Sequence, residues 1–146
     1  MTQVDFYIID PDNGENRQHY ACRLTDKAYR QGRRVYIHTG SPGESQMLDR
    51  LLWTFRDQSF VPHGIAGTTD PEFTPVLIGD QPPPEQADDV LINLSLAAEP
   101  PSFFSRFERV AEIVDQQNEV KQTSRRHYRF YLDRGYPLNT HGKSRQ

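Results

Sequence analysis

Three residues near the carboxyl end of the chain have types and spacing suited to an acidic ligand. Lys121, Arg125 and Tyr128 follow an i, i+4, i+7 pattern, which puts them on one face of a predicted helix. Arg129 extends this cationic stripe, and Val114 would lie under the start of the helix. A guanidinium group binds carboxylates in a bidentate way, and an aromatic ring with aliphatic neighbours receives an apolar side chain. The pattern therefore suits either an acidic peptide with a hydrophobic end or single-stranded nucleic acid that stacks on an aromatic ring.

The charge of the chain is unevenly distributed. The 146 residues carry a net charge of −3, but residues 121–146 hold seven basic residues and one acidic residue, a net charge of +6. Residues 1–120 therefore carry −9. A basic end on an acidic body predicts an acidic partner for that end. The length fits one domain, and no apolar run approaches the ~18 residues of a membrane helix, so we expect a cytoplasmic protein without membrane contact.

A second candidate site lies in the middle of the chain, where aromatic residues surround the end of a predicted helix. The only tryptophan, Trp53, is followed by Phe60, Pro62 and His63 in a proline-containing loop. Exposed tryptophan and phenylalanine side chains often dominate the energetics of protein interfaces. The segment is therefore either a corner of the core or an anchor for a protein partner.

The chain lacks the motifs of a nucleotide-binding enzyme. The turn after the first predicted strand, 10–14, carries two acids and no Gly-x-Gly-x-x-Gly pattern. The five histidines have no metal-ligand spacing, and Cys22 lies among apolar neighbours as a structural thiol. His38, at a strand end, is the one position around which a site of a Rossmann-like enzyme could form. No acid, base and nucleophile assemble, so we predict neither catalysis nor a cofactor.

The periodicity predicts alternating strands and helices. We expect an α/β fold, namely a single Rossmann-like domain over 1–140 with a mostly parallel five-stranded sheet and helices on both faces. A flexible tail would follow at 141–146. Residues 103–115 fit either helix or strand, and we favour a short helix followed by a strand. The predicted strands are 4–10, 33–38, 76–79, 90–94 and 108–114, and the predicted helices are 15–31, 44–55, 101–107 and 119–134.

Motifs spread over nearly the whole chain resemble the chi subunit family of bacterial DNA polymerase III. No single motif is diagnostic, but their order and spacing in a chain of this length are specific. The residues that carry the resemblance are Phe6-Tyr7-Ile8-Ile9-Asp10, Gly32-Arg33-Arg34-Val35, Leu52-Trp53, Ser59-Phe60-Val61-Pro62-His63, Asp89-Val90-Leu91-Ile92-Asn93-Leu94, Lys121-Gln122, Arg125, Tyr128, Tyr131 and Gly135-Tyr136-Pro137-Leu138-Asn139.

The resemblance implies a non-enzymatic accessory subunit of the clamp loader. Such proteins pair with the psi subunit, or with a helicase-like partner in its place. They also bind the acidic C-terminal tail of the single-stranded DNA-binding protein (SSB), which ends in phenylalanine, and so reach single-stranded DNA indirectly. By position, Lys121, Arg125, Tyr128 and Val114 match the residues that receive this tail. Trp53 and Phe60 match the aromatic segment used for partner contact, to which we add Pro62 and His63.

Two other functions stay open at this point. The basic helix could bind single-stranded nucleic acid directly, although the acidic body disfavours this interpretation. An enzyme with a site near His38 would need a ligand at the strand ends. A gel shift without other proteins tests the first alternative, and thermal-shift screening with nucleotides tests the second.

Overall fold

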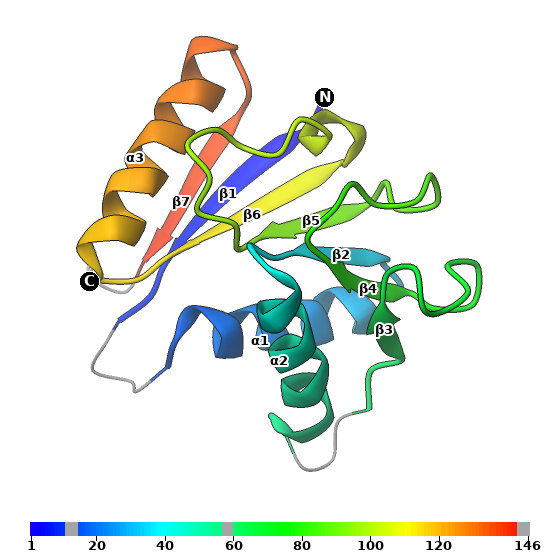
Figure 1. Ribbon diagram of the computed structural model, residues 1–146. Helices are drawn as coiled ribbons and strands as arrows, with labels where there is room; N and C mark the ends of the chain where they lie inside the picture. The colour runs from blue at the N-terminus through cyan, green and yellow to red at the C-terminus, as the bar shows by residue number, and fades with distance from the viewer. Residues whose placement is uncertain (11–14, 57–59, 143–146) are drawn as a thin grey trace.

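The computed structural model describes residues 1–10, 15–56 and 60–142. Within these residues a seven-stranded sheet has three α-helices packed against it (Figure 1). The elements are β1 (Gln3–Ile8), α1 (Arg17–Arg30), β2 (Val35–His38), α2 (Pro42–Thr54), β3 (His63–Ile65), β4 (Val76–Gly79), β5 (Val90–Asn93), a 3₁₀ turn (Phe104–Arg106), β6 (Arg109–Val114), α3 (Asn118–Asp133) and β7 (Leu138–Gly142).

The strand order is β3-β4-β2-β5-β6-β1-β7, and every strand pair among the described residues is parallel. The central strands β2, β4 and β5 are buried along their whole length, as expected where helices cover both faces of a parallel sheet. The α/β, Rossmann-like prediction is therefore confirmed.

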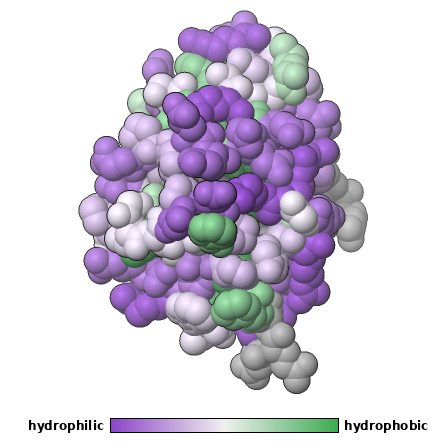
Figure 2. All heavy atoms as spheres, turned by 90° about the vertical axis from the view of Figure 1, so that its right-hand side faces the viewer, coloured by the Kyte–Doolittle hydropathy of each residue, from purple (hydrophilic) through white to green (hydrophobic). Residues whose placement is uncertain are grey.

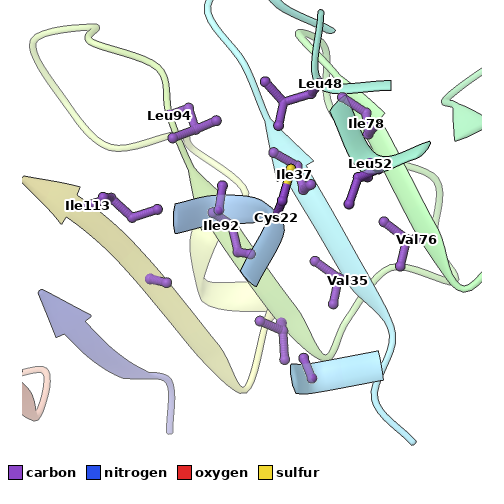
Figure 3. Packing of buried hydrophobic residues seen from close by; sticks show 14 of the residues in the cluster. Cys22, Val35, Ile37, Leu48, Leu52, Val76, Ile78, Ile92, Leu94 and Ile113 are labelled. Carbon is purple, nitrogen blue, oxygen red and sulfur yellow. The ribbon is translucent and has the colours of Figure 1, made fainter. Parts of the chain in front are cut away.

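Helices α1 and α2 cover one face of the sheet, and α3 covers the other. The first face buries Cys22 and Leu48 against Ile37, Ile78 and Ile92 (Figure 3). On the second face Tyr131 of α3 packs in a cluster with Phe6 of β1 and Leu91 of β5. Burial raises the pKa of the Cys22 thiol to about 12, so this side chain is a protonated core residue, as predicted.

Local sequence signals account for the helix ends. The Asn16 side chain accepts a hydrogen bond from the backbone of His19 at 2.8 Å and caps α1. At the start of α2 the Ser41 side chain accepts a hydrogen bond from the backbone of Glu44, and the Glu44 side chain accepts one from the backbone of Gly40. Gly135, with a φ of 78°, follows the end of α3 in the left-handed region that glycine adopts without strain.

The prediction of five strands is wrong, because β3 and β7 were missed. Both lie at the edges of the sheet and carry no alternating apolar pattern. β3 has only three residues, and a side chain at Gly64 would meet Thr69 at 2.7 Å. β7 is mostly polar and pairs with β1 alone. His141 and Gly142 belong to β7, so the tail predicted from 141 cannot begin before 143. Residues 143–146 lie outside the described residues.

The ambiguous region resolves as predicted into a short helical turn followed by a strand. The turn is a 3₁₀ helix at Phe104–Arg106, and β6 follows at Arg109–Val114. β6 pairs with β1 and β5 inside the sheet, so its position explains why side chains on both of its faces are buried.

Candidate functional site

Helix α3 presents the cationic stripe beside its buried face. Val120, Thr123, His127 and Tyr131 point into the protein at the spacing of an amphipathic helix. Lys121 and Arg125 lie beside this buried face on the helix surface, where Lys121 is half-buried and Arg125 is exposed. The Tyr128 side chain is 39% exposed. The helix therefore holds the predicted binding residues along the edge of its contact with the sheet.

These residues line one groove between α3 and the strands β1, β6 and β7. The groove has a volume of about 510 Å³. Phe6 and Ile8 of β1 and Val114 of β6 supply apolar side chains, and Ile8 pairs directly with Val114 in the sheet. The Tyr128 ring packs on Phe6 with 5.3 Å between ring centroids. Four of the five predicted residues thus meet at one site, where an apolar floor has Lys121 and Arg125 at its rim.

Arg129 is the exception among the predicted residues. It is exposed and is not part of the groove lining. Among the residues that the structure describes, Asp115 is the one acid that lines the groove. Its carboxylate accepts hydrogen bonds from the backbone and side chain of Gln117, both at 2.9 Å, just before α3 begins. The acidic side chain is therefore engaged at the helix start, and Lys121 and Arg125 supply the positive charge of the groove.

A buried polar network fastens α3 to the sheet below this groove. Glu112 of β6 accepts hydrogen bonds from Tyr131 at 2.9 Å and from Asn93 of β5 at 3.1 Å. Its other oxygen contacts Nδ1 of His127 at 3.1 Å, and Nε2 of His127 faces the carbonyl oxygen of Ala97 at 2.7 Å. The sequence analysis missed this network, although a glutamate in the middle of an apolar strand was a usable signal.

The protonation of the network follows from its partners. Burial alone would lower the pKa of His127, but the hydrogen bond and charge of Glu112 and the carbonyl of Ala97 raise it above its ordinary value. Both ring nitrogens face acceptors, so the protonated ring, which has two donors, suits this position. Burial, followed by the charge of Glu112, also raises the pKa of Tyr131, which therefore stays a neutral donor.

Arg17 lies at the carboxyl ends of β5 and β6. Doubly wound folds bind nucleotides at this edge of the sheet. The Arg17 side chain is buried and donates to the carbonyl oxygens of Ile113 at 3.0 Å and Leu94 at 3.2 Å. Leu94 directly follows β5, and Ile113 belongs to β6. The predicted lack of a phosphate motif at 10–14 falls mainly on residues outside the described part of the chain.

His38 does not sit in a catalytic arrangement. It is 9% exposed, its ring packs at 5.1 Å against Phe103, and burial lowers its pKa. In the described residues no group of three or more histidine, cysteine, aspartate or glutamate side chains could hold a metal ion. None of the described helices is both long and apolar enough to span a membrane.

The aromatic segment forms an exposed pair on the other side of the sheet from the α3 groove. Trp53 is 54% exposed and Phe60 is 63% exposed, with 5.7 Å between their ring centroids. Pro62 is half-buried. The side chain of His63 is fully buried and contacts the carbonyl oxygens of Val61 and Asp49 at 2.6 and 2.9 Å. His63 lies 4.6 Å from Trp53, so it supports this ring and cannot itself be an exposed contact.

The molecular face in Figure 2 is largely hydrophilic, and its hydrophobic side chains stand apart from one another. The sequence analysis left open whether the aromatic segment was a corner of the core or a partner anchor. The exposure of Trp53 and Phe60 fits an anchor of two rings better than a corner of the core.

The fold and the two exposed sites define a Rossmann-like α/β protein with a buried arginine at the carboxyl ends of β5 and β6. Comparison with known proteins identifies it further. The chain belongs to the DNA polymerase III chi subunit family, whose family model matches residues 1–139. It is 44% identical over 141 residues to the DNA polymerase III subunit chi of Pseudomonas aeruginosa, covering 97% of this chain and 96% of the relative.

Two more distant relatives also match over nearly their full length. The DNA polymerase III subunit chi of Escherichia coli is 30% identical over 145 residues, covering 96% of this chain and 97% of the relative. That of Haemophilus influenzae is 29% identical over 138 residues, covering 94% of each. The resemblance inferred from the sequence motifs is therefore confirmed, and it connects the chain to DNA replication.

Proposed function

We propose that this protein is a non-enzymatic adaptor of the DNA polymerase III clamp loader that binds the acidic C-terminal tail of SSB in the α3 groove. The groove carries the proposal, because it joins two cations to an apolar floor in one cavity of about 510 Å³. Family membership supports the setting in replication.

Each part of the groove has a role in this proposal. Arg125 binds the terminal carboxylate of the tail or its aspartates in a bidentate way. Lys121 attracts the aspartates as a compact point charge. Tyr128 and Val114 hold the terminal phenylalanine against Phe6 and Ile8, where a ring finds aromatic and aliphatic contacts.

The expected energies favour weak and salt-dependent binding. Complete burial of the terminal phenylalanine contributes about 1.5–3 kcal/mol. Exposed ion pairs contribute about 0–1 kcal/mol each and are screened by salt. Several tails on one SSB-coated strand would raise the apparent affinity through effective concentration. Weak single contacts that act together suit a protein that must release SSB as a replication fork advances.

The test is a titration of the whole protein with a fluorescent peptide of the SSB C-terminal residues at low and high salt. We expect micromolar binding that weakens with salt and disappears when the terminal phenylalanine is removed. Arg125→Ala should weaken binding about tenfold. Arg129→Ala is the matched control, because Arg129 lies one turn further along the same helix outside the groove. Equal losses for the two variants would reject the groove as the site.

The second contact in the proposal is pairing with the psi subunit through Trp53 and Phe60, with Pro62 at the edge and His63 beneath. The two rings lie side by side and exposed, as anchors of a protein interface do. Trp53→Ala should prevent co-purification with psi and leave binding of the SSB peptide unchanged. A psi complex that survives this variant would contradict the assignment. Because a helicase-like partner would use the same rings, it should lose binding with the same variant.

A further inference from the structure

The face of β1 opposite the α3 groove borders a second groove. Side chains alternate along a strand, so Phe6 and Ile8 face α3 whereas Asp5 and Tyr7 face the other side. On that side α1 packs over part of the sheet and leaves a groove of about 710 Å³ beside β1, β5 and β6. Its lining comes from α1 and from the strands β1, β5 and β6, together with the segments that follow α1 and α2. We call it the α1 groove.

The α1 groove concentrates positive charge in an otherwise acidic part of the chain. Its lining holds six basic residues and two acidic ones, Asp5 and Asp26, although residues 1–120 are net negative. The basic residues come from α1, from the segments after α1 and α2, and from β6. They are Arg23, Lys27, Arg30, Arg33, Arg56 and Arg109.

Three cations of the groove, Lys27, Arg30 and Arg56, are only loosely engaged by acids. Asp26 is shared by Arg30 and Arg56, each at 3.2 Å. Lys27 has no ion pair with any residue in the described part of the chain. The side chains of Arg30 and Arg56 are 60% and 48% exposed. The Asp26 side chain is only 6% exposed, so one arginine has to stay with it while the other turns towards an arriving anion.

Two further arginines of the lining are paired with acids from outside it. Arg23 contacts Glu15 at 2.6 Å, and Arg33 contacts Asp89 at 3.0 Å. Asp5, a buried acid of the lining, forms an ion pair with Arg109 at 3.3 Å and lies 3.0 Å from Nε2 of His141. Carboxylates therefore occupy these cations in part, and a ligand has to compete for them.

Aromatic rings lie beside the cations. The Tyr7 ring stacks on His141 of β7 with 4.7 Å between centroids and 12° between planes. Tyr20 of α1 lies 5.6 Å from Tyr7, and the guanidinium of Arg23 stands 5.3 Å over the Tyr20 ring. Burial, followed by the charge of Asp5, raises the pKa of Tyr7 to about 12, so the ring is a neutral phenol. The Tyr7 and Tyr20 side chains are half-buried, and His141 is exposed.

We propose that the α1 groove binds single-stranded nucleic acid, with phosphates at Lys27 and Arg30 and bases against Tyr20 and the Tyr7–His141 pair. A cationic channel that tracks the backbone and aromatic rings that stack on bases together make up the general mode of single-strand binding. An acidic peptide would use the cations but not the flat rings. This contact does not depend on the SSB tail, because it lies on the opposite face of β1 and can be measured without SSB.

The experiment is a fluorescence anisotropy titration of the full chain with a labelled oligothymidylate at several salt concentrations. Lys27→Glu should weaken binding about tenfold. Lys27→Gln should reduce the slope of log affinity against log salt by about 0.7, the value for one phosphate contact on a single strand. Lys27 is an exposed helix residue, so both variants should fold. Arg129→Glu on α3 is the matched control and should leave binding unchanged.

Three outcomes would overturn the proposal. No binding of the oligothymidylate at low salt would show that the groove does not take nucleic acid. A loss with Arg129→Glu but not with Lys27→Glu would assign nucleic-acid binding to the basic helix instead. Tighter binding of a labelled polyglutamate than of the oligothymidylate, with the same loss in Lys27→Glu, would identify an acidic peptide as the occupant.

Discussion

The two grooves on opposite faces of β1 differ in how their charges are assembled. The cations of the α3 groove, Lys121 and Arg125, come from one helix, whereas those of the α1 groove come from four separate segments. The floor of the α3 groove is apolar, and the α1 groove has polar and aromatic residues of β1 at its side. The α3 groove therefore suits a short peptide with an apolar end, and the α1 groove suits a polyanion with flat bases.

The same difference decides what sequence reasoning can find. A stripe within one helix is visible as an i, i+4, i+7 pattern, and four of the five candidate residues predicted from the sequence line one groove. The α1 groove is invisible in the sequence, because net charge counted over residues 1–120 averages its cations with distant acids. Only the strand order brings Arg109 of β6 next to Lys27 of α1.

The largest expected effect comes from the network that holds α3. Glu112→Ala should lower the free energy of unfolding by about 3–5 kcal/mol, because it leaves a buried protonated histidine without its partner. Urea denaturation measures this change. Glu108→Ala is the matched control, since its exposed ion pair with Arg33 should contribute less than about 1 kcal/mol. Similar losses in both variants would contradict a special role for the network.

A smaller effect separates the two grooves directly. Tyr128→Ala removes an aromatic wall of the α3 groove and should weaken SSB-peptide binding about tenfold, or about 1.4 kcal/mol. Oligothymidylate binding in the α1 groove should not change, because Tyr128 does not line it. The pair of titrations sharpens the comparison. A parallel loss of both ligands would mean that they share one site.

The network also predicts a pH dependence of stability. The pKa of His127 is raised in the folded state, so its contribution is fully present below the ordinary value near 6.5 and is lost as the pH rises through the folded pKa. The difference in unfolding free energy between the wild type and His127→Gln should therefore shrink as the pH increases above 6.5. Urea denaturation at a series of pH values measures it. A difference that grows with pH would contradict the assignment of the proton.

The smallest expected effect concerns the rim of the α3 groove. Lys121→Gln should weaken SSB-peptide binding only a few-fold at low salt, with no difference at high salt, because an exposed point charge is screened. The peptide titration at two salt concentrations measures this change. A loss that persists at high salt would show that Lys121 acts through packing and not through its charge.

Strands and helices were predictable where the burial of their side chains sets the pattern of apolar residues. They were not predictable where pairing with an adjacent strand alone determines the structure. β2, β4 and β5 are buried on both faces and read as apolar runs, and α3 reads as an amphipathic helix. β3 and β7 form only because an adjacent strand offers hydrogen bonds, so their short or polar sequences carry no signal. The roles of Arg17 and His63 were equally hidden, because carbonyl oxygens distant in sequence hold both side chains.

The most direct test of the α3 groove as the tail-binding site is an NMR titration of the isotope-labelled protein with the SSB C-terminal peptide. We predict that the backbone amide signals of Val114, Lys121, Arg125 and Tyr128 shift with peptide concentration, and that those of Tyr20 and Lys27 do not. Shifts centred on Tyr20 and Lys27, with none on α3, would contradict the claim that this groove receives the tail.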